Sequence, residues 1–445
     1  MIYLTGEIHP APDKSISHRA LMISSIAEGK TTIKNFLRSD DCLSTLKCLQ
    51  ALGVEIEDDG GKEIIVHGKG KFLSPPASGA PLYAGNSGTT ARLLSGILAG
   101  QNFKTTLTGD ASLSSRPMNR IARPLEMMGA TVKTTDGKLP LEISGGRLKA
   151  IDYDSPVASA QVKSCILLAA LYADGKTTFR EPQISRDHTE RMLSNFGVRL
   201  TSSVTDNHGP SAGTRYSVSL TGPVKKLVSP GEILVPADIS SAAFFLVAGA
   251  TIPGSRIKLK NVGLNPTRTG ILSVLKRMGA AIKISIPDGK NHSDSEPSGD
   301  ITVSYSPGLR AVTIDKDEIP LLIDELPVIA VAATQADGET IVKGASELRV
   351  KETDRIKSIV NELSKIGAEI KEFPDGFSVK GPVKLSHKKN QAPLESYGDH
   401  RMAMSLAVAL LIATGEDNFQ DIKNYECASV SYPDFYKTLK SLIKK

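Results

Sequence analysis

The chain has 445 residues, of which 40% are hydrophobic, and this length and composition allow two or three globular domains. It carries 54 Lys and Arg residues against 48 Asp and Glu residues, a net charge of +6, and its basic residues are spread along the whole sequence. Because aromatic residues make up only 5% and Trp is absent, the composition argues against a nucleic-acid-binding protein and favours small anionic ligands.

One unit recurs six times, at intervals of about 70–85 residues, which is typical of an internally repeated fold. Each copy begins with an apolar stretch that is rich in small residues and ends in Gly. Because these stretches carry few charges, we expect them to form helices that are buried on all sides. The six stretches are Ser17–Gly29, Thr89–Gly100, Ala160–Gly175, Ser240–Gly254, Leu326–Gly338 and Met402–Gly415.

After each apolar stretch comes a short run that predicts a strand, such as KTTIKNF (30–36), ETIVKGA (339–345) or NFQDIKN (418–424). A second segment then spaces apolar residues three or four apart and stops at Gly, which predicts a helix with one exposed face. Further strands such as EIIVHG (63–68) complete the unit. The second helices are expected within residues 43–54, 119–132, 190–200, 270–282 and 356–370.

Polar clusters lie immediately before most of the apolar stretches, or in their first turn. A helix N-terminus presents unpaired N–H groups and a partial positive charge, so several of them around one cleft would suit multiply anionic substrates. The repeat pattern alone also allows a scaffold without chemistry. The clusters are PDKSISHR (12–19), YAGNSGTT (83–90), VASAQVK (157–163), VPADISS (235–241), LIDELP (322–327) and YGDHR (397–401).

Two of these clusters are more suggestive than the rest, although each has a structural alternative. Ser15 could cap its helix, but a cap does not account for the cations Lys14 and Arg19 beside it. Asp324 and Glu325 interrupt an apolar run, where carboxylates are seldom buried without partners. Either they cap the following helix or at least one of them is a site carboxylate with a tuned pKa.

The remaining polar segments have ordinary local explanations. The turn over residues 85–90 is rich in Gly but is not a P-loop, and Arg116 fits a solvated basic face. Residues 159–163 and 186–190 could cap or start helices, and the charge cluster over residues 349–355 could be solvated. Only His400 and Arg401, which start a charge-free helix, are hard to explain as surface residues.

Taken together, these segments resemble the 5-enolpyruvylshikimate-3-phosphate synthases along essentially the whole chain. The most specific motifs are RVKETDR, GDHR and PDKSISHR, and seven more occur in the family's order: GNSGTTARL, RPMNR, SAQVKS, SRDHTERML, NPTRTG, LIDELP and VSYPDF. The resemblance implies a two-domain, inverted α/β barrel-like fold with six βαβαββ repeats, three per domain, and an active site in the inter-domain cleft. The domains would comprise residues 13–232 in one and residues 1–12 with 233–445 in the other.

The same resemblance assigns the site residue by residue. Asp324 would lie at the reacting 5-hydroxyl, and Glu352 would protonate the methylene carbon and later take a proton back. Lys14 and His400 would lie near this chemistry. Shikimate 3-phosphate would be bound by Ser15, Arg19, Ser159, Ala160, Gln161, Arg186, Asp324 and Lys351. Phosphoenolpyruvate would be bound by Lys14, Gly88, Arg116, Gln161, Arg355 and Arg401.

The implied activity is transfer of the enolpyruvyl group of phosphoenolpyruvate to shikimate 3-phosphate, on the route to chorismate and the aromatic amino acids. Two phosphates and two carboxylates then meet in one site, which explains the many cations. No oxidation or group carrier is needed, so no cofactor is expected. The resemblance also implies a monomer that glyphosate inhibits. The Lys that some members carry before the final Pro-Asp-Phe is absent from this sequence, which reads Cys427 to Pro433 there.

Two other functions are weighed against this one. A related transferase acts on UDP-N-acetylglucosamine and uses a reactive Cys on the loop that here spans residues 109–115, which contains no Cys. A non-catalytic basic scaffold would bind polyanions with a steep salt dependence.

Cysteine, histidine and hydropathy patterns favour a cytoplasmic protein without a resident metal. The four cysteines form no CxxC pair, which indicates a reducing compartment, and neither HExxH nor paired Cys/His spacing occurs. The first 15 residues lack a basic region followed by an apolar run, and no uncharged apolar stretch reaches about 18 residues. We therefore expect neither a metal site nor a membrane segment.

Overall fold

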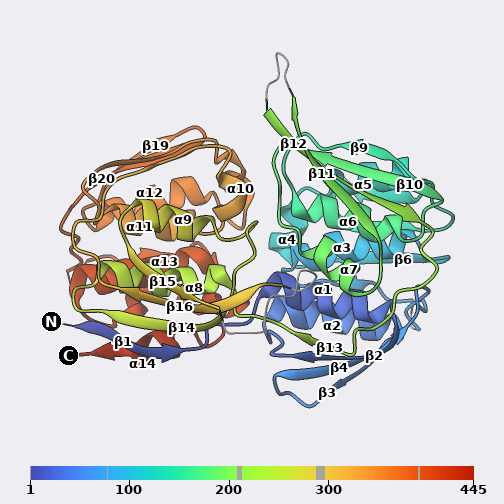
Figure 1. The fold of residues 1–445 in the computed structure, drawn as a ribbon, viewed down its shortest axis with the longest axis horizontal. Helices are drawn as coiled ribbons and strands as arrows, with labels where there is room; N and C mark the ends of the chain where they lie inside the picture. Colours follow the sequence, from blue (N-terminus) through green and yellow to red (C-terminus); the bar gives the residue numbers. More distant parts are fainter. Residues whose placement is uncertain (1, 78, 208–212, 287–295, 389–390) are drawn as a thin grey trace. The chain divides into compact units, whose positions relative to one another are not determined.

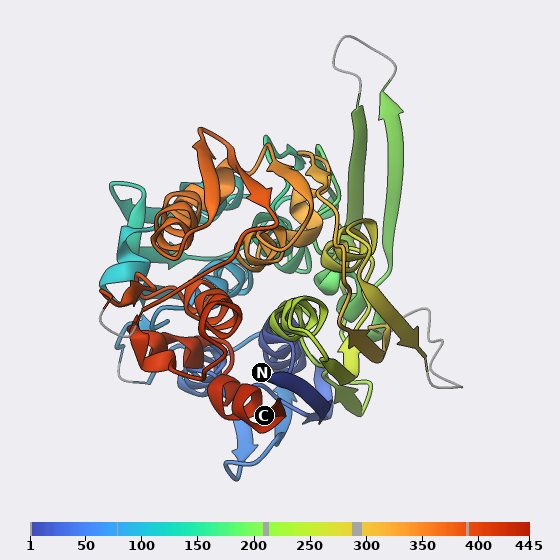
Figure 2. The same ribbon diagram turned by 90° about the vertical axis from the view of Figure 1, so that its left-hand side faces the viewer.

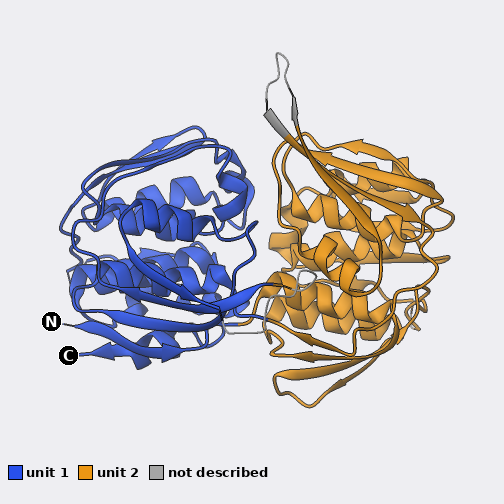
Figure 3. Cartoon of the chain, in the orientation of Figure 1, with its two compact units in different colours: residues 1–11, 236–291, 297–445 blue, residues 12–235, 292–296 orange. Residues whose placement is uncertain are grey.

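The computed structural model describes residues 2–77, 79–207, 213–286, 296–388 and 391–445. The chain divides into two compact units (Figure 3). Counting described residues only, unit 1 comprises residues 2–11, 236–286, 297–388 and 391–445, and unit 2 comprises residues 12–77, 79–207, 213–235 and Glu296. The predicted α/β fold is confirmed in both units.

Unit 2 contains three four-stranded sheets with one shared plan. Their strand orders are β13-β2-β4-β3, β5-β6-β8-β7 and β9-β10-β12-β11, and in each the first pair is parallel and the other two pairs are antiparallel. The strands are β2 (Glu28–Lys34), β3 (Glu55–Asp58), β4 (Glu63–Lys69), β5 (Leu82–Tyr83), β6 (Lys104–Thr108), β7 (Thr131–Thr135), β8 (Lys138–Ser144), β9 (Asp152–Asp154), β10 (Gly175–Glu181), β11 (Leu200–Asn207), β12 (Gly213–Gly222) and β13 (Glu232–Leu234).

The three apolar helices of unit 2 are buried on almost all sides, as their composition predicts. They are α1 (Lys14–Ser25), α3 (Gly88–Ala99) and α6 (Ala160–Ala170), and α3 contacts both α1 and α6. Gly96 allows α3 and α6 to approach closely, because a Cβ atom there would collide with the carbonyl oxygen of Cys165. The second helices cover this core and expose one face: α2 (Asp40–Ala51), α5 (Asn119–Met127) and α7 (His188–Asn195), with the short α4 (Ala111–Ser115) before α5 (Figure 1).

Unit 1 repeats this plan with two changes. Its first sheet has the order β15-β16-β14-β1-β23, in which β1 pairs parallel with β14 and antiparallel with β23 at the C-terminal end. Its second sheet has the order β17-β18-β20-β19, and its third, within the described part of the unit, has only the parallel pair β21-β22. The strands are β1 (Tyr3–Ile8), β14 (Arg256–Gly263), β15 (Ala281–Ser285), β16 (Ser298–Ser304), β17 (Thr313–Ile314), β18 (Gly338–Val342), β19 (Glu369–Phe373), β20 (Gly376–Gly381), β21 (Leu394–Glu395), β22 (Ile422–Lys423) and β23 (Ile443–Lys444).

The strand predicted over residues 418–424 is largely wrong. Phe419–Asp421 forms the 3-10 helix η2, and only Ile422 and Lys423 pair with β21. The segment has one β-branched residue, and the Asn and Asp side chains around it favour turns over strands. The chain continues through η3 (Tyr425–Val430) and α14 (Phe435–Leu442).

Three apolar helices form the core of unit 1: α8 (Ile239–Thr251), α11 (Leu326–Ala333) and α13 (His400–Thr414). Each of the three contacts the other two (Figure 2). Every residue of α8 and α11 is buried. The more polar helices are α9 (Gly270–Arg277) and α12 (Arg355–Lys365), accompanied by α10 (Ile319–Leu322) and η1 (Ser346–Val350). Over the described residues, no helix combines the length and the apolar character that crossing a membrane requires.

Candidate active site

The predicted residues of unit 2 lie around the N-terminal ends of its three apolar helices. Asp13, Ser87 and Ser159 cap α1, α3 and α6, each accepting a hydrogen bond from the backbone N–H three residues later, at 2.8, 3.1 and 3.4 Å. Ser159 is therefore a cap, as its position suggested. The capping explanation for Ser15 is wrong, because Asp13 performs that role.

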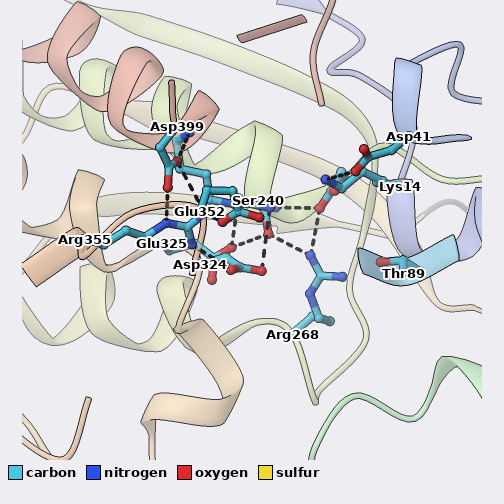
Figure 4. Close-up of polar contacts among 12 residues, drawn as sticks. Lys14, Asp41, Thr89, Ser240, Arg268, Asp324, Glu325, Glu352, Arg355 and Asp399 are labelled. Atoms are coloured by element: carbon cyan, nitrogen blue, oxygen red, sulfur yellow. Dashed lines mark hydrogen bonds and ion pairs between the residues drawn. The ribbon is translucent and has the colours of Figure 1, made fainter. Parts of the chain in front are cut away.

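Lys14 is the first residue of α1, and its ammonium is fixed by a carboxylate from α2. Its Nζ lies 3.0 Å from Oδ2 of Asp41, and the two side chains are 17% and 8% exposed (Figure 4). Cys42 adds a weak bond from its Sγ to the carbonyl oxygen of Lys14 at 3.9 Å. The start of α2 therefore orients the Lys14 side chain while leaving it partly accessible.

Arg19 is held by residues from three helices of unit 2, and its side chain is almost fully buried. Its Nε donates to Oγ1 of Thr189 at 2.7 Å, its Nη2 to Oγ of Ser164 at 2.7 Å, and its Nη1 to the carbonyl oxygen of Ser15 at 2.9 Å. Burial, with a smaller contribution from the nearby cation of Arg186, lowers the pKa of Arg19 to about 10. Arg19 is therefore still a cation at neutral pH, and Arg186 is close enough to affect it.

Two guanidinium groups approach the first turn of α3 beside Gly88. A Cβ atom on Gly88 would lie 3.1 Å from Nη1 of Arg92 and 3.6 Å from Nη1 of Arg116. Nη1 of Arg92 donates to Oε1 of Gln161 at 2.6 Å, and Nη2 of Arg116 donates to Oδ1 of Asn86 at 2.8 Å. Because Gly has no side chain, an anionic ligand can reach the backbone and both cations here.

The residues in the first turn of α6 differ in how deeply they are buried. Ala160 and Gln161 are half-buried at the start of the helix, whereas Lys163 is fully buried. The Lys163 ammonium lies 3.0 Å from Glu181 and 2.8 Å from Glu190. It is thus engaged inside the unit, although the sequence allowed it to face a ligand.

Two of the predicted residues of unit 1, Asp324 and Glu352, bind the buried guanidinium of Arg355, the first residue of α12. Its Nε donates to Asp399 at 2.7 Å, its Nη1 to Asp324 at 3.2 Å, and its Nη2 to Glu352 at 2.6 Å (Figure 4). Burial alone would lower the pKa of Arg355, but the charges of the three carboxylates outweigh it and raise the pKa above its ordinary value. One permanent cation therefore fixes the two carboxylates that sequence analysis assigned to proton transfer.

Arg401, in the first turn of α13, shares one of these carboxylates, Asp324, with Arg355 but is held less tightly. Its guanidinium is 3.7 Å from Oδ2 of Asp324 and 4.0 Å from Oε1 of Glu325. Glu325 also accepts a hydrogen bond from Ser240, whose Oγ accepts one from Nη2 of Arg268 at 2.7 Å. Glu325 makes no capping bond to α11, so the capping alternative is wrong for this residue.

Lys351, Glu352 and His400 complete the predicted set. Lys351 follows η1 and Glu352 precedes α12, and both are half-buried, whereas His400 is the buried first residue of α13. The charge cluster over residues 349–355 is thus partly an ion-pair network and not a solvated surface.

Several residues at these clusters were not predicted as site residues. Asp399, Arg268 and Arg92 stand inside the motifs GDHR, NPTRTG and GNSGTTARL, which could have pointed to them. Asp41 and Glu181 carry no such signal, because each becomes part of the site through a partner distant in sequence.

The chemistry that each cluster offers follows from its charges. Unit 2 presents cations, hydroxyl and amide groups and helix N-termini, which suit phosphate and carboxylate groups. Unit 1 presents carboxylates fixed by arginines, which suit proton transfer. Across the described ranges, no three His, Cys, Asp or Glu side chains form a group that could hold a metal ion.

Comparisons with known proteins agree on one family. The family model described as EPSP synthase (3-phosphoshikimate 1-carboxyvinyltransferase) matches residues 2–439. The 3-phosphoshikimate 1-carboxyvinyltransferases of Bacillus velezensis and Geobacillus kaustophilus are 50% and 51% identical to this chain, over 99% of it and 98% of each relative. A solved EPSP synthase from Acinetobacter baumannii matches with a TM-score of 0.81 and 41% identity, covering 100% of this chain and 98% of that one. The enolpyruvyl transferase NikO from Streptomyces tendae shares the fold, with a TM-score of 0.73 and 17% identity over 99% of this chain and 96% of that one.

Proposed function

The chain belongs to the EPSP synthase family, and we propose that the two clusters described above carry out the family's reaction. The enzyme transfers the enolpyruvyl group of phosphoenolpyruvate to the 5-hydroxyl of shikimate 3-phosphate, with release of phosphate. The assignment of individual residues to this reaction is carried by one observation: the guanidinium of Arg355 holds both Asp324 and Glu352 in hydrogen bonds.

The reaction is an addition followed by an elimination. The 5-oxygen of shikimate 3-phosphate bonds to C2 of phosphoenolpyruvate while C3 takes up a proton and becomes a methyl group. The resulting tetrahedral intermediate then loses a proton from that methyl group and expels phosphate, which restores the double bond. We assign Asp324 to accept the proton of the hydroxyl, and Glu352 to give the proton to C3 and take one back.

We assign the binding of shikimate 3-phosphate mainly to the residues of unit 2 around Arg19. Three of the five N–H groups of Arg19 donate to Thr189, Ser164 and Ser15. These bonds fix the plane of the guanidinium and leave two N–H groups for a phosphate. The other ligands from this unit are Ser15, Ser159, Ala160, Gln161 and Arg186, to which unit 1 adds Asp324 and Lys351.

For phosphoenolpyruvate, the proposal uses Lys14, Gly88, Arg116 and Gln161 from unit 2. Among the arginines of unit 1, Arg401 is the stronger candidate, because its carboxylate neighbours lie at 3.7 and 4.0 Å, beyond ordinary hydrogen-bond distance. Arg355 donates four hydrogen bonds to carboxylates, so we assign it mainly to holding Asp324 and Glu352 in place.

The related transfer to UDP-N-acetylglucosamine is disfavoured by the same residues. The loop over residues 109–115 contains no Cys, and the four cysteines of the chain lie elsewhere, at Cys42, Cys48, Cys165 and Cys427. Burial raises the pKa of all four thiols, which disfavours the reactive thiolate that such a mechanism needs.

Isotope incorporation tests the assigned roles. In D2O the wild type should yield product with deuterium in the methylene group, because C3 is protonated by an exchangeable acid and then loses one of three hydrogens. Glu352→Gln should abolish this exchange. Glu362→Gln removes a buried carboxylate about two turns into α12 and should leave the exchange unchanged. Undiminished exchange in Glu352→Gln would remove this residue from the proton transfer.

From the family resemblance alone, we also propose that the enzyme acts as a cytoplasmic monomer. Sedimentation velocity over a range of protein concentrations tests the oligomeric state. A concentration-independent dimer would contradict the proposal.

A further inference from the structure

A buried carboxylate in unit 2 joins two segments that carry proposed ligands of shikimate 3-phosphate. Glu181 is the last residue of β10, and its side chain is 0% exposed. It accepts hydrogen bonds from four donors: the backbone N–H of Ser159 at 3.2 Å, Nζ of Lys163 at 3.0 Å, and the N–H and Oγ of Ser185 at 2.9 and 2.8 Å. Neither Glu181 nor any of these three donor residues contributes a reacting group.

The four donor groups lie on two segments, the start of α6 and the segment before α7. Ser159 is the cap of α6 and precedes Ala160 and Gln161, whereas Ser185 directly precedes Arg186. One carboxylate thus fixes the backbone beside both sets of proposed ligands, and each set lies within two residues of a donor.

Lys163 makes a further link between the same two segments, and its ammonium offsets the negative charge of Glu181. Besides Glu181, its ammonium donates to the carbonyl oxygen of Ser185 at 3.0 Å, pairs with Glu190 at 2.8 Å, and lies 4.9 Å from the ring centroid of Tyr216. Burial alone would lower the pKa of Lys163, but the charges of Glu190 and Glu181 outweigh it and raise the pKa. Lys163 is therefore a cation at neutral pH, and it lies between two buried carboxylates, Glu181 and Glu190.

We propose that Glu181, supported by Lys163, is a positioning residue for shikimate 3-phosphate, holding the starts of α6 and of the segment before α7 at the spacing that the substrate requires. This inference rests on the proposed function, because it takes Ser159 to Gln161 and Arg186 as ligands of that substrate. Glu181 itself is buried and acts through these neighbours.

The substitution Glu181→Gln isolates this role. Gln offers one acceptor oxygen where Glu offers two, so placing that oxygen toward Lys163 and Ser185 turns the amide NH2 toward the N–H of Ser159. The start of α6 therefore loses the hydrogen bond that the N–H of Ser159 donates to residue 181. Lys163 keeps its ion pair with Glu190, so no uncompensated cation remains and we expect the variant to fold.

The expected result is selective for one substrate. The dissociation constant of shikimate 3-phosphate, measured by calorimetry on the full-length enzyme, should rise about tenfold, as for the loss of one hydrogen bond to a charged group. The turnover number and the KM for phosphoenolpyruvate should change by no more than about twofold, since Gln161 is also held by Arg92 and Thr89.

Glu362→Gln provides a matched control in unit 1. Glu362 is also 0% exposed and accepts bonds from a lysine, a hydroxyl and a backbone N–H, namely Lys365, Tyr397 and Glu395. It should lower the melting temperature similarly without weakening shikimate 3-phosphate binding. If both variants weaken binding equally, the effect of Glu181 is general destabilisation and the proposal fails.

Two further variants keep the outcomes distinguishable. Arg19→Ala removes a proposed direct ligand: if it weakens binding and Glu181→Gln does not, the positioning role is overturned while the proposed function stands. If neither weakens binding, the ligand assignment itself fails.

Should Glu181→Gln not fold, Ser185→Ala removes one donor to the same carboxylate and should weaken binding about threefold. Wild-type affinity in Ser185→Ala would then overturn the proposal.

Discussion

Replacement of Arg19 by Ala tests the phosphate-binding assignment of unit 2 most sharply. Three of its five N–H groups are bonded to Thr189, Ser164 and Ser15, so only two can reach a ligand. If one of them binds the phosphate of shikimate 3-phosphate, its loss costs about 1.5–3 kcal/mol, which raises the dissociation constant roughly 10- to 150-fold.

The fold should survive this substitution. The hydroxyls of Ser164 and Thr189 also bond each other at 2.7 Å, so neither is left without a partner when the guanidinium is removed. Arg19→Lys keeps the charge but not the planar fork, and should give a dissociation constant between those of the wild type and Arg19→Ala.

Calorimetric titration of each purified variant with shikimate 3-phosphate measures the effect, and a thermal melt confirms that the variant is folded. A dissociation constant for Arg19→Ala within about threefold of the wild type would exclude a direct bond from Arg19 to the phosphate, because even the weakest charge-assisted bond is worth more than that.

The other predictions concern catalysis, inhibition and pH. Glu352→Gln should lower turnover by about 100- to 10,000-fold with substrate binding retained, the range for loss of a general acid, and near-native turnover would exclude this role. Gly88→Ala should raise the inhibition constant of glyphosate about tenfold or more, and the KM for phosphoenolpyruvate less, since the added methyl group would lie 3.1 Å from Arg92 and intrude on the longer ligand first. An unchanged inhibition constant would contradict the pocket-lining role of Gly88. Burial, aided by the nearby cations Lys14 and Arg19, lowers the pKa of His18 well below its usual value, so below about pH 6.5 the unfolded chain binds a proton that the folded chain does not. The free energy of unfolding should therefore decrease as the pH is lowered below about 6.5, by up to about 1.4 kcal/mol per pH unit, and this slope should be reduced in denaturation curves of His18→Asn.

The helical framework could be predicted because its signals are local. Apolar periodicity and a terminal Gly placed a helix within residues 356–370, and α12 spans Arg355–Lys365. The lack of charge in residues 240–254 predicted a helix buried on all sides, and α8 is buried at every position. The strand over residues 418–424 failed because a short polar segment depends on its neighbours for pairing and not on its own propensity.

The interactions within the candidate site could not be predicted, because they join residues far apart in the sequence. Arg355 meets Asp399 across 44 positions, and Arg19 meets Thr189 across 170. The charge of RVKETDR was visible in the sequence, but whether Arg355 faced solvent or a carboxylate depended on where α13 begins. Glu181 gave no signal at all, since a single Glu at the end of a strand is typical of a surface residue.

Release of phosphate from phosphoenolpyruvate, measured with alternative acceptors, shows which acceptor the enzyme uses. We expect rapid release with shikimate 3-phosphate and none above background with UDP-N-acetylglucosamine or without an acceptor. Release that depends on UDP-N-acetylglucosamine, or no release with shikimate 3-phosphate from folded enzyme, would contradict this expectation.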